Sequence, residues 1–70
     1  MSITGTIEYI ELGMGFWGIV TAAGDRYRPL ELPVAYQQPG KSIRATVEPL
    51  PDIATAELWG TVCRITALAE

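Results

Sequence analysis

The 70-residue sequence has no histidine, one cysteine and one lysine, and each shortage argues against a class of function. Without histidine the chain lacks the side chain that most often acts as a base near neutral pH. Cys63 cannot form an internal disulfide, and a single thiol without histidine does not make a structural zinc site. Serine nucleophiles are limited to Ser2 and Ser42. The sequence therefore predicts no enzyme, no metal site and no cofactor.

Long apolar runs and an excess of positive charge are missing as well. No stretch reaches the roughly 18 apolar residues that a membrane-spanning helix needs, and no basic start precedes an apolar run at the N-terminus. We therefore expect no membrane partner and, by default, a cytoplasmic location. Five Lys and Arg against eight Asp and Glu give a net charge of −3. This charge repels phosphate backbones and disfavours nucleic acid as a partner, although it leaves that alternative open.

The size and composition predict one small folded domain over residues 1–70. Hydrophobic residues make up 49% of the chain and charged residues 19%, which is typical of a folded chain rather than a disordered one. A chain of this size buries only about 60% of the surface that its unfolded form exposes, so its core must be small.

Strand patterns cover the first half of the chain. In "SITGTIEYIEL" apolar and polar residues alternate with the two-residue period of a half-buried strand. Gly5 and a later switch of the apolar parity indicate a bulge or bend in this strand. "FWGIV" predicts a second strand over residues 16–20, and Gly24 predicts a hairpin into a third strand over residues 26–30.

The second half continues with one short helix and two strands. "PVAYQQPG" has proline at a first helical position and Pro-Gly as a stop, which predicts one or two helical turns. Residues 43–47 alternate as a fourth strand, which "PLPD" ends. After a loop over residues 50–55, "AELWGTVCRITAL" predicts the fifth strand.

This order predicts an all-β, five-stranded OB-like barrel with a short helix between the third and fourth strands. Barrel closure would remove the exposed strand edges that so small a chain protects poorly. An SH3-like barrel is the alternative, and it differs mainly in placing its short helical turn before the last strand.

The stretch "GMGFWGIV" has the spacing of a glycine-rich phosphate loop, but its context does not suit one. A dinucleotide-binding loop must lead into a long helix, and a hairpin follows here instead. A kinase-type loop needs a lysine on a following strand, whereas Lys41 lies beyond the predicted helix. We interpret Gly13 and Gly15 as residues of a chain reversal and Gly18 as a site of close packing across a tight barrel.

"GFWGIV", a glycine turn, "YRPLELP" and "ATAELWGT" together resemble a group of short, largely uncharacterised prokaryotic domains. These share a G-F-[WY]-G-I-V…Y-x-P-L-x-L-P…W-G-T pattern, and the resemblance covers about residues 5–65. It implies the OB-like barrel fold and transfers no activity, cofactor or site residue. The sequence departs from the group at residues 34–36, where the group is usually more charged.

The candidate ligand-binding face comes from the second and third predicted strands. Phe16 and Trp17 are adjacent in one strand, so one of them must point outward, and the sequence does not say which. Arg26 and Arg28 share a parity and should project beside that outward aromatic. Trp59 and Tyr27 are expected in the core, and Cys63 as a small buried hydrophobe.

Three functions fit the sequence, and all are non-enzymatic. The leading hypothesis is a binding module for a protein or peptide, which the acidic total favours. The first alternative is binding of single-stranded nucleic acid by stacking and guanidinium contacts on the same face. The second alternative is a homo-oligomer that hides the exposed apolar residues. The oligomeric state does not follow from the sequence.

Overall fold

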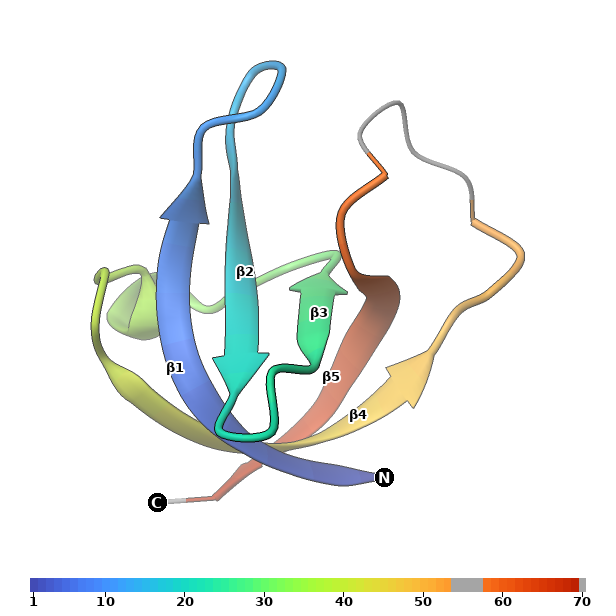
Figure 1. Ribbon diagram of the computed structural model, residues 1–70. Helices are drawn as coiled ribbons and strands as arrows, with labels where there is room; N and C mark the ends of the chain where they lie inside the picture. The colour runs from blue at the N-terminus through green and yellow to red at the C-terminus, as the bar shows by residue number, and fades with distance from the viewer. Residues whose placement is uncertain (54–57, 70) are drawn as a thin grey trace.

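The computed structural model describes residues 1–53 and 58–69, and these form a closed five-stranded β-barrel (Figure 1). In chain order the elements are β1 (Ser2–Ile10), β2 (Phe16–Thr21), β3 (Arg26–Pro29), the 3-10 turn η1 (Val34–Tyr36), β4 (Ser42–Pro49) and β5 (Thr61–Ala69). Around the barrel the order is β1-β2-β3-β5-β4, and β4 pairs back with β1. The predicted all-β barrel is confirmed.

The position of the helical turn decides between the two barrels that the sequence left open. η1 lies between β3 and β4, and β5 follows β4 through a loop. β3 and β5 pair in parallel, and the other neighbouring pairs are antiparallel. The architecture is therefore that of an OB-like barrel.

The structure decides one detail of the predicted strands and corrects another. Of the bulge or bend expected in β1, the structure contains the bend: the pairing runs without a register shift, and the strand follows a curved path (Figure 1). The register shift lies instead between Thr46 and Val47 in the β4–β5 pairing. β5 begins at Thr61, later than expected. Residues 56 and 57, the expected start of that strand, and residues 54 and 55 of the expected loop lie outside the described residues.

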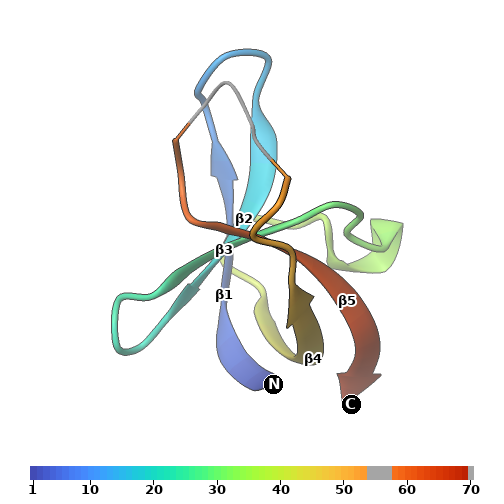
Figure 2. The ribbon, with the colours of Figure 1, turned by 90° about the vertical axis from the view of Figure 1, so that its right-hand side faces the viewer.

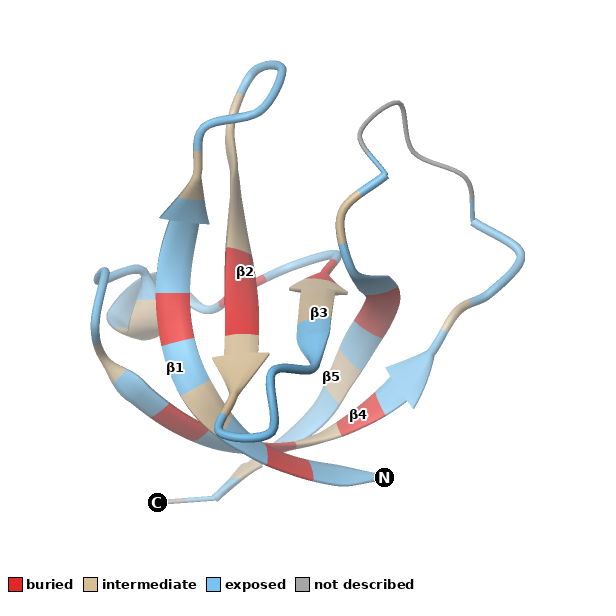
Figure 3. Ribbon diagram, viewed as in Figure 1, coloured by how far each residue is buried: buried red, intermediate tan, exposed pale blue. Residues whose placement is uncertain are grey.

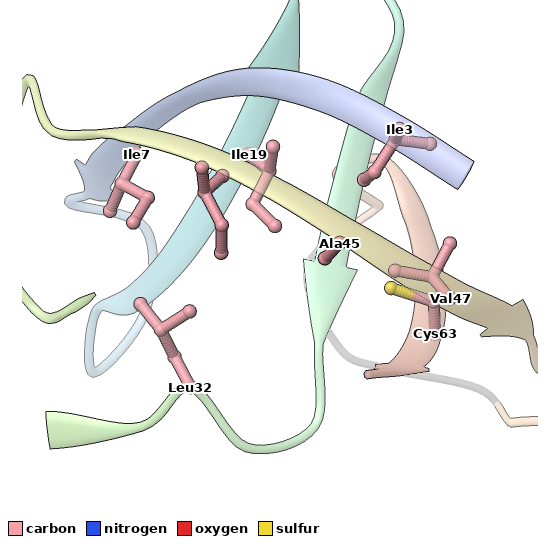
Figure 4. Packing of buried hydrophobic residues seen from close by; sticks show 8 residues of the cluster. Ile3, Ile7, Ile19, Leu32, Ala45, Val47 and Cys63 are labelled. Atoms are coloured by element: carbon pink, nitrogen blue, oxygen red, sulfur yellow. The ribbon is translucent and has the colours of Figure 1, made fainter. Parts of the chain in front are cut away.

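Gly5 lies where β1 passes from one neighbour to the other. It pairs with Thr21 of β2 and with Ile43 of β4. A Cβ atom at this position would lie 2.6 Å from the Val20 carbonyl oxygen and 2.9 Å from a methyl carbon of Ile19. Glycine therefore lets β1 approach β2 at this point, and β1 follows the curved path seen in Figures 1 and 4.

The barrel interior is aliphatic. Every strand contributes inward residues, and the buried positions alternate with exposed ones along much of β1 and β4 (Figure 3). The buried hydrophobic residues are Ile3, Ile7, Ile19, Leu32, Ile43, Ala45, Val47, Val62 and Cys63. Leu32 comes from the segment after β3 and points toward Ile7 and Ile19, so it closes one side of the core (Figure 4).

The segment that carries Leu32 ends in a single helical turn. The Tyr36 amide donates to the Pro33 carbonyl oxygen at 2.8 Å, and the Gln37 side-chain amide donates to the Leu32 carbonyl oxygen at 2.9 Å. The predicted short helix between the third and fourth strands is confirmed. Within residues 1–53 and 58–69, no helix is both long enough and apolar enough to cross a membrane.

Candidate functional site

The alternation of β2 assigns its two aromatic residues to opposite sides of the barrel wall. Trp17 shares the inward parity of buried Ile19 and packs against the core cluster. Phe16 shares the opposite parity with Gly18 and Val20, so its side chain lies on the outer surface of β2. Phe16 is therefore the outward aromatic that the sequence left undecided, and Trp17 does not belong to the outer face.

Trp17 instead pairs with another aromatic ring at the end of the barrel. Its cross-strand partner in the β1–β2 register is Tyr9, and the two rings meet edge to face with centroids 5.1 Å apart. Tyr9 is exposed, and its hydroxyl lies 3.5 Å from the Met14 carbonyl oxygen in the β1–β2 loop. Trp17 packs against the core, and exposed Tyr9 lies between Trp17 and that loop.

The two arginines of β3 project to the outer surface, as their shared parity predicts. The Arg28 guanidinium carbon lies 3.8 Å from the centroid of the Phe16 ring. The Arg26 guanidinium carbon lies 5.8 Å from the centroid of the Trp59 ring. Both distances fall within the range of cation–π contacts. Tyr27, between them, packs against the core as expected.

Trp59 is not a core residue, and the prediction that placed it there is wrong. It precedes β5, and its ring lies over Gly18 on the outside of β2: a Cβ atom on Gly18 would overlap this ring, with Trp59 Cζ3 at 2.6 Å. The Trp59 ring also meets the Phe16 ring edge to face, with centroids 5.6 Å apart. The strand parity that suggested burial does not continue through Gly60, whose φ is +70°.

Phe16, Arg26, Arg28 and Trp59 thus form one surface, which we call the aromatic–arginine face. Three of these residues are predicted site residues. Trp59 is the site residue that the sequence did not predict. Gly60, directly before β5, is the one local feature that could have indicated a loop at this position.

Exposed apolar residues border this face in two loops. Met14, in the β1–β2 loop that leads into Phe16, is 99% exposed, and Leu58, next to Trp59, is also 99% exposed. Leu12 and Ile53 in the same two loops are exposed as well. Figures 1 and 2 both show the β1–β2 loop and the described parts of the β4–β5 loop at the same end of the barrel.

Two glycines of the phosphate-loop pattern have the structural roles expected of them, and the third does not. Gly13 and Gly15 adopt positive φ angles of 56° and 85° in the β1–β2 reversal, where the Gly15 amide donates to the Leu12 carbonyl oxygen at 2.8 Å. Gly18 faces outward from β2, so its close packing is with the Trp59 ring on the outside and not across the barrel as expected. The pattern leads into a strand and then a hairpin, in which Gly24 has a φ of 91°.

Few groups elsewhere in the described part of the chain suggest chemistry. Cys63 is a free, fully buried thiol, and burial raises its pKa above the ordinary value of 9.0. No group of three His, Cys, Asp or Glu side chains within residues 1–53 and 58–69 is arranged to hold a metal ion. Arg64 Nη1 lies 3.5 Å from Glu48 Oε1, and both side chains are well exposed.

Comparisons of the chain with protein-family models, with curated proteins and with solved structures found no match.

Proposed function

We propose that the protein is a non-enzymatic binding module that holds a protein or peptide partner on its aromatic–arginine face. The observation that carries this proposal is the pairing of Phe16 with Arg28 and of Trp59 with Arg26 on the outside of β2 and β3. The two rings are half-buried, and neither is part of the core. The expected protein-binding function is therefore kept, with Trp59 in place of Trp17.

The composition of the face supports a protein partner. The centres of protein interfaces are enriched in aromatic residues, methionine and arginine, and they are depleted of lysine, glutamate and aspartate. The face offers Phe16, Trp59 and two arginines, and the adjoining loops add Met14 and Leu58. Large exposed apolar side chains gathered at one end of a small domain are typical of a surface that a partner covers.

The chemistry of the remaining residues supports a function without catalysis. No histidine is present to exchange protons near neutral pH. A nucleophilic cysteine needs a lowered pKa and access to substrate. Cys63 has neither, because it is fully buried and its pKa is raised. We therefore base the proposed function on binding alone.

A charge reversal tests the proposed face. Arg26→Glu combined with Arg28→Glu should abolish capture of partners by the immobilised domain from a lysate, because both cations next to the rings change sign. Arg44→Glu is the matched control, since Arg44 is exposed on β4. Each variant is first checked for folding by urea denaturation. Capture of the same partners in the same amounts by the double variant would disprove the proposal.

A crosslinking experiment locates the partner independently of charge. A photoreactive amino acid in place of Leu58, which is almost fully exposed beside Trp59, should form covalent adducts with the bound partner. The same amino acid in place of Arg44 should form few adducts. Equal yields at the two positions would contradict a binding site at this end of the barrel.

Single-stranded nucleic acid is the second candidate, and the same two ring–arginine pairs favour it. Aromatic rings beside arginines on the β2–β3 face are the means by which OB barrels stack bases. The net charge of −3 opposes it, because long-range attraction to phosphates is missing.

An amide NMR titration with a mixed single-stranded oligonucleotide at low salt separates the two candidates. Nucleic-acid binding predicts shifts over residues 16–21 and 26–30, a steep loss of affinity with salt and a loss on Phe16→Ala. A spectrum that does not change at low salt would eliminate this candidate and leave the protein partner.

A further inference from the structure

β5 is much longer than β3, which pairs with one of its two edges. We call this edge the β3 side of β5. β3 pairs with β5 only from Thr61 to Cys63, whereas β5 continues to Ala69 and pairs there with β4 on its other side. The Leu30 amide donates to the Cys63 carbonyl oxygen at 2.9 Å. Beyond this bond, no backbone segment of the described chain pairs with the β3 side of β5 over residues 64–69.

Two prolines end β3 early and so create this free edge. Pro29 is the last residue of β3, and Pro33 precedes η1. Proline has no amide hydrogen to donate and fixes its own φ, so prolines at this spacing disfavour a longer regular strand along β5. Between the two prolines the chain turns inward to bury Leu32, which draws the backbone away from β5.

An open groove of about 1130 Å³ lies over the free edge. One wall is residues 64–68 of β5, and the other wall is residues 30–34. The groove contains apolar surface on both walls. Leu30 and Val34 are 50% and 81% exposed, and Ile65 and Leu68 are half-buried. An extended segment in this groove would therefore meet backbone groups along β5 and aliphatic side chains on both sides.

The charged residues that line the groove are mainly positive. They are Arg28, Arg64 and Glu31, whereas the whole chain has a net charge of −3. The ion pair of Arg64 with Glu48 joins two exposed side chains, and such pairs contribute little to stability. Arg64 can therefore exchange this partner for a carboxylate of a bound segment.

We propose that the β5 edge and this groove bind an extended, acidic and aliphatic segment of a partner protein as an added β-strand. Addition of a strand to an open sheet edge takes its affinity from main-chain hydrogen bonds and its specificity from alternate side chains. This site goes beyond the aromatic–arginine face, which it adjoins at Phe16 and Arg28.

A partner of this chemistry fits the edge better than a second copy of the chain. β5 contains no acidic residue, and its one charged residue is Arg64. Two β5 edges paired with each other would therefore bring like charges into the same small sheet, and like charges across strands are destabilising. An acidic segment brings the opposite charge.

The probe is a fluorescein-labelled peptide of eight alternating glutamate and valine residues, followed by anisotropy and by amide NMR. We expect saturable binding and shifts in the amide signals of residues 64–68. The same peptide with lysine in place of glutamate should bind on the order of tenfold more weakly. A peptide with alternate backbone nitrogens methylated should also lose on the order of tenfold, because it cannot donate to the edge.

Variants of the chain distinguish this groove from the aromatic–arginine face. Arg64→Glu should weaken binding of the glutamate–valine peptide, and Arg44→Glu should not. Arg26→Glu should also leave peptide binding unchanged, because Arg26 does not line the groove. If the charge-reversal test disproves the aromatic–arginine face while the glutamate–valine peptide still binds, only the proposed function is wrong and the groove proposal stands.

Four results would overturn the proposal. These are no binding of the peptide, equal binding of the lysine peptide, equal binding of the methylated peptide, and shifts confined to residues 16–21 and 26–28. A fifth is self-association of the free chain, by sedimentation, with its contacts on residues 64–69, because the occupant would then be a second copy.

Discussion

The inner and outer sides of the barrel wall use different apolar residues. The interior is filled by isoleucine, valine, leucine, alanine and one cysteine. None of the six aromatic residues, all of which lie in the described part of the chain, is fully buried. Trp17, Tyr27 and Tyr36 pack against the core but remain half-buried, at its margin. The space inside explains the difference, because even a methyl group on Gly5 would lie 2.9 Å from an Ile19 methyl carbon.

This division separates the residues that stabilise the fold from those available to bind a partner. Stability comes from close packing of small aliphatic side chains, which is sensitive to changes of a single methylene group. The rings of Phe16 and Trp59 lie on the outside, where they contact arginines and each other. The experiments below test this separation, starting with the change of largest expected effect.

Removal of an inner side chain should destabilise the domain most. Ile19→Ala leaves a cavity in the fully buried centre of the core, and such changes cost about 2–5 kcal/mol of unfolding free energy. Val34→Ala is the control, because Val34 is 81% exposed and should change stability by less than about 0.5 kcal/mol. Urea denaturation measures both, and similar losses in the two variants would show that the interior does not dominate stability.

Two glycines test the inner and outer sides with the same substitution. Gly5→Ala should cost about 1–3 kcal/mol, because its new methyl group faces the Val20 backbone oxygen and Ile19. Gly18→Ala meets only the far edge of the Trp59 ring and a carbon of Ile10, so the ring can move away at a cost below about 1 kcal/mol.

Urea denaturation and the ring-current shifts of Trp59 give the two readouts of this glycine pair. Gly18→Ala should shift the signals of Phe16 and Trp59, whereas Gly5→Ala should lower the urea midpoint without separating those rings. A larger loss of stability in Gly18→Ala than in Gly5→Ala would mean that Trp59 is fixed as firmly as a core residue.

The fold could be predicted where the sequence carries a local signal. Alternation in residues 43–47, the proline and glycine positions around η1 and the glycine of the β2–β3 hairpin all predict elements that the structure contains. The position of the single helical turn between the third and fourth strands was enough to favour the OB-like barrel over the SH3-like one. The signals around η1 and in the β2–β3 hairpin depend on the conformational limits of proline and glycine, which act within a few residues.

The candidate site could be predicted only in part, because its geometry depends on contacts distant in sequence. The alternation of Arg26 and Arg28 predicts their outward direction correctly. The choice between Phe16 and Trp17 depends on which side of β2 faces the core, and two adjacent aromatic residues give no local answer. The groove along β5 depends on the parallel pairing of β3 with β5, which joins residues more than 30 positions apart.

The buried thiol makes the stability of the inner side of the barrel depend on pH. The pKa of Cys63 is raised in the folded state by burial, so the native chain keeps its thiol proton at a pH where the unfolded chain has lost it. The unfolded state then binds fewer protons, and stability falls as the pH rises through 9.0. The loss reaches at most about 1.4 kcal/mol per pH unit.

Urea denaturation of the native chain and of Cys63→Ala between pH 7 and pH 10 measures this dependence. The difference in stability between the two proteins should shrink as the pH rises, because the variant has no thiol to ionise. A constant difference over this range would show that the folded chain ionises the thiol as readily as the unfolded one.

The smallest effect is expected where an arginine lies over an aromatic ring on the outer face. A double-mutant cycle with Phe16→Leu and Arg28→Met should give a coupling of about 0.5–1 kcal/mol, the usual range for a partly exposed cation–π contact. A coupling of this size holds the arginine in place, and a partner carboxylate can still draw it away from the ring. A coupling well above 2 kcal/mol, measured by urea denaturation, would instead make the pair a part of the fold. The outer side would then contribute to stability as the inner side does, and Arg28 would be a poor candidate for binding.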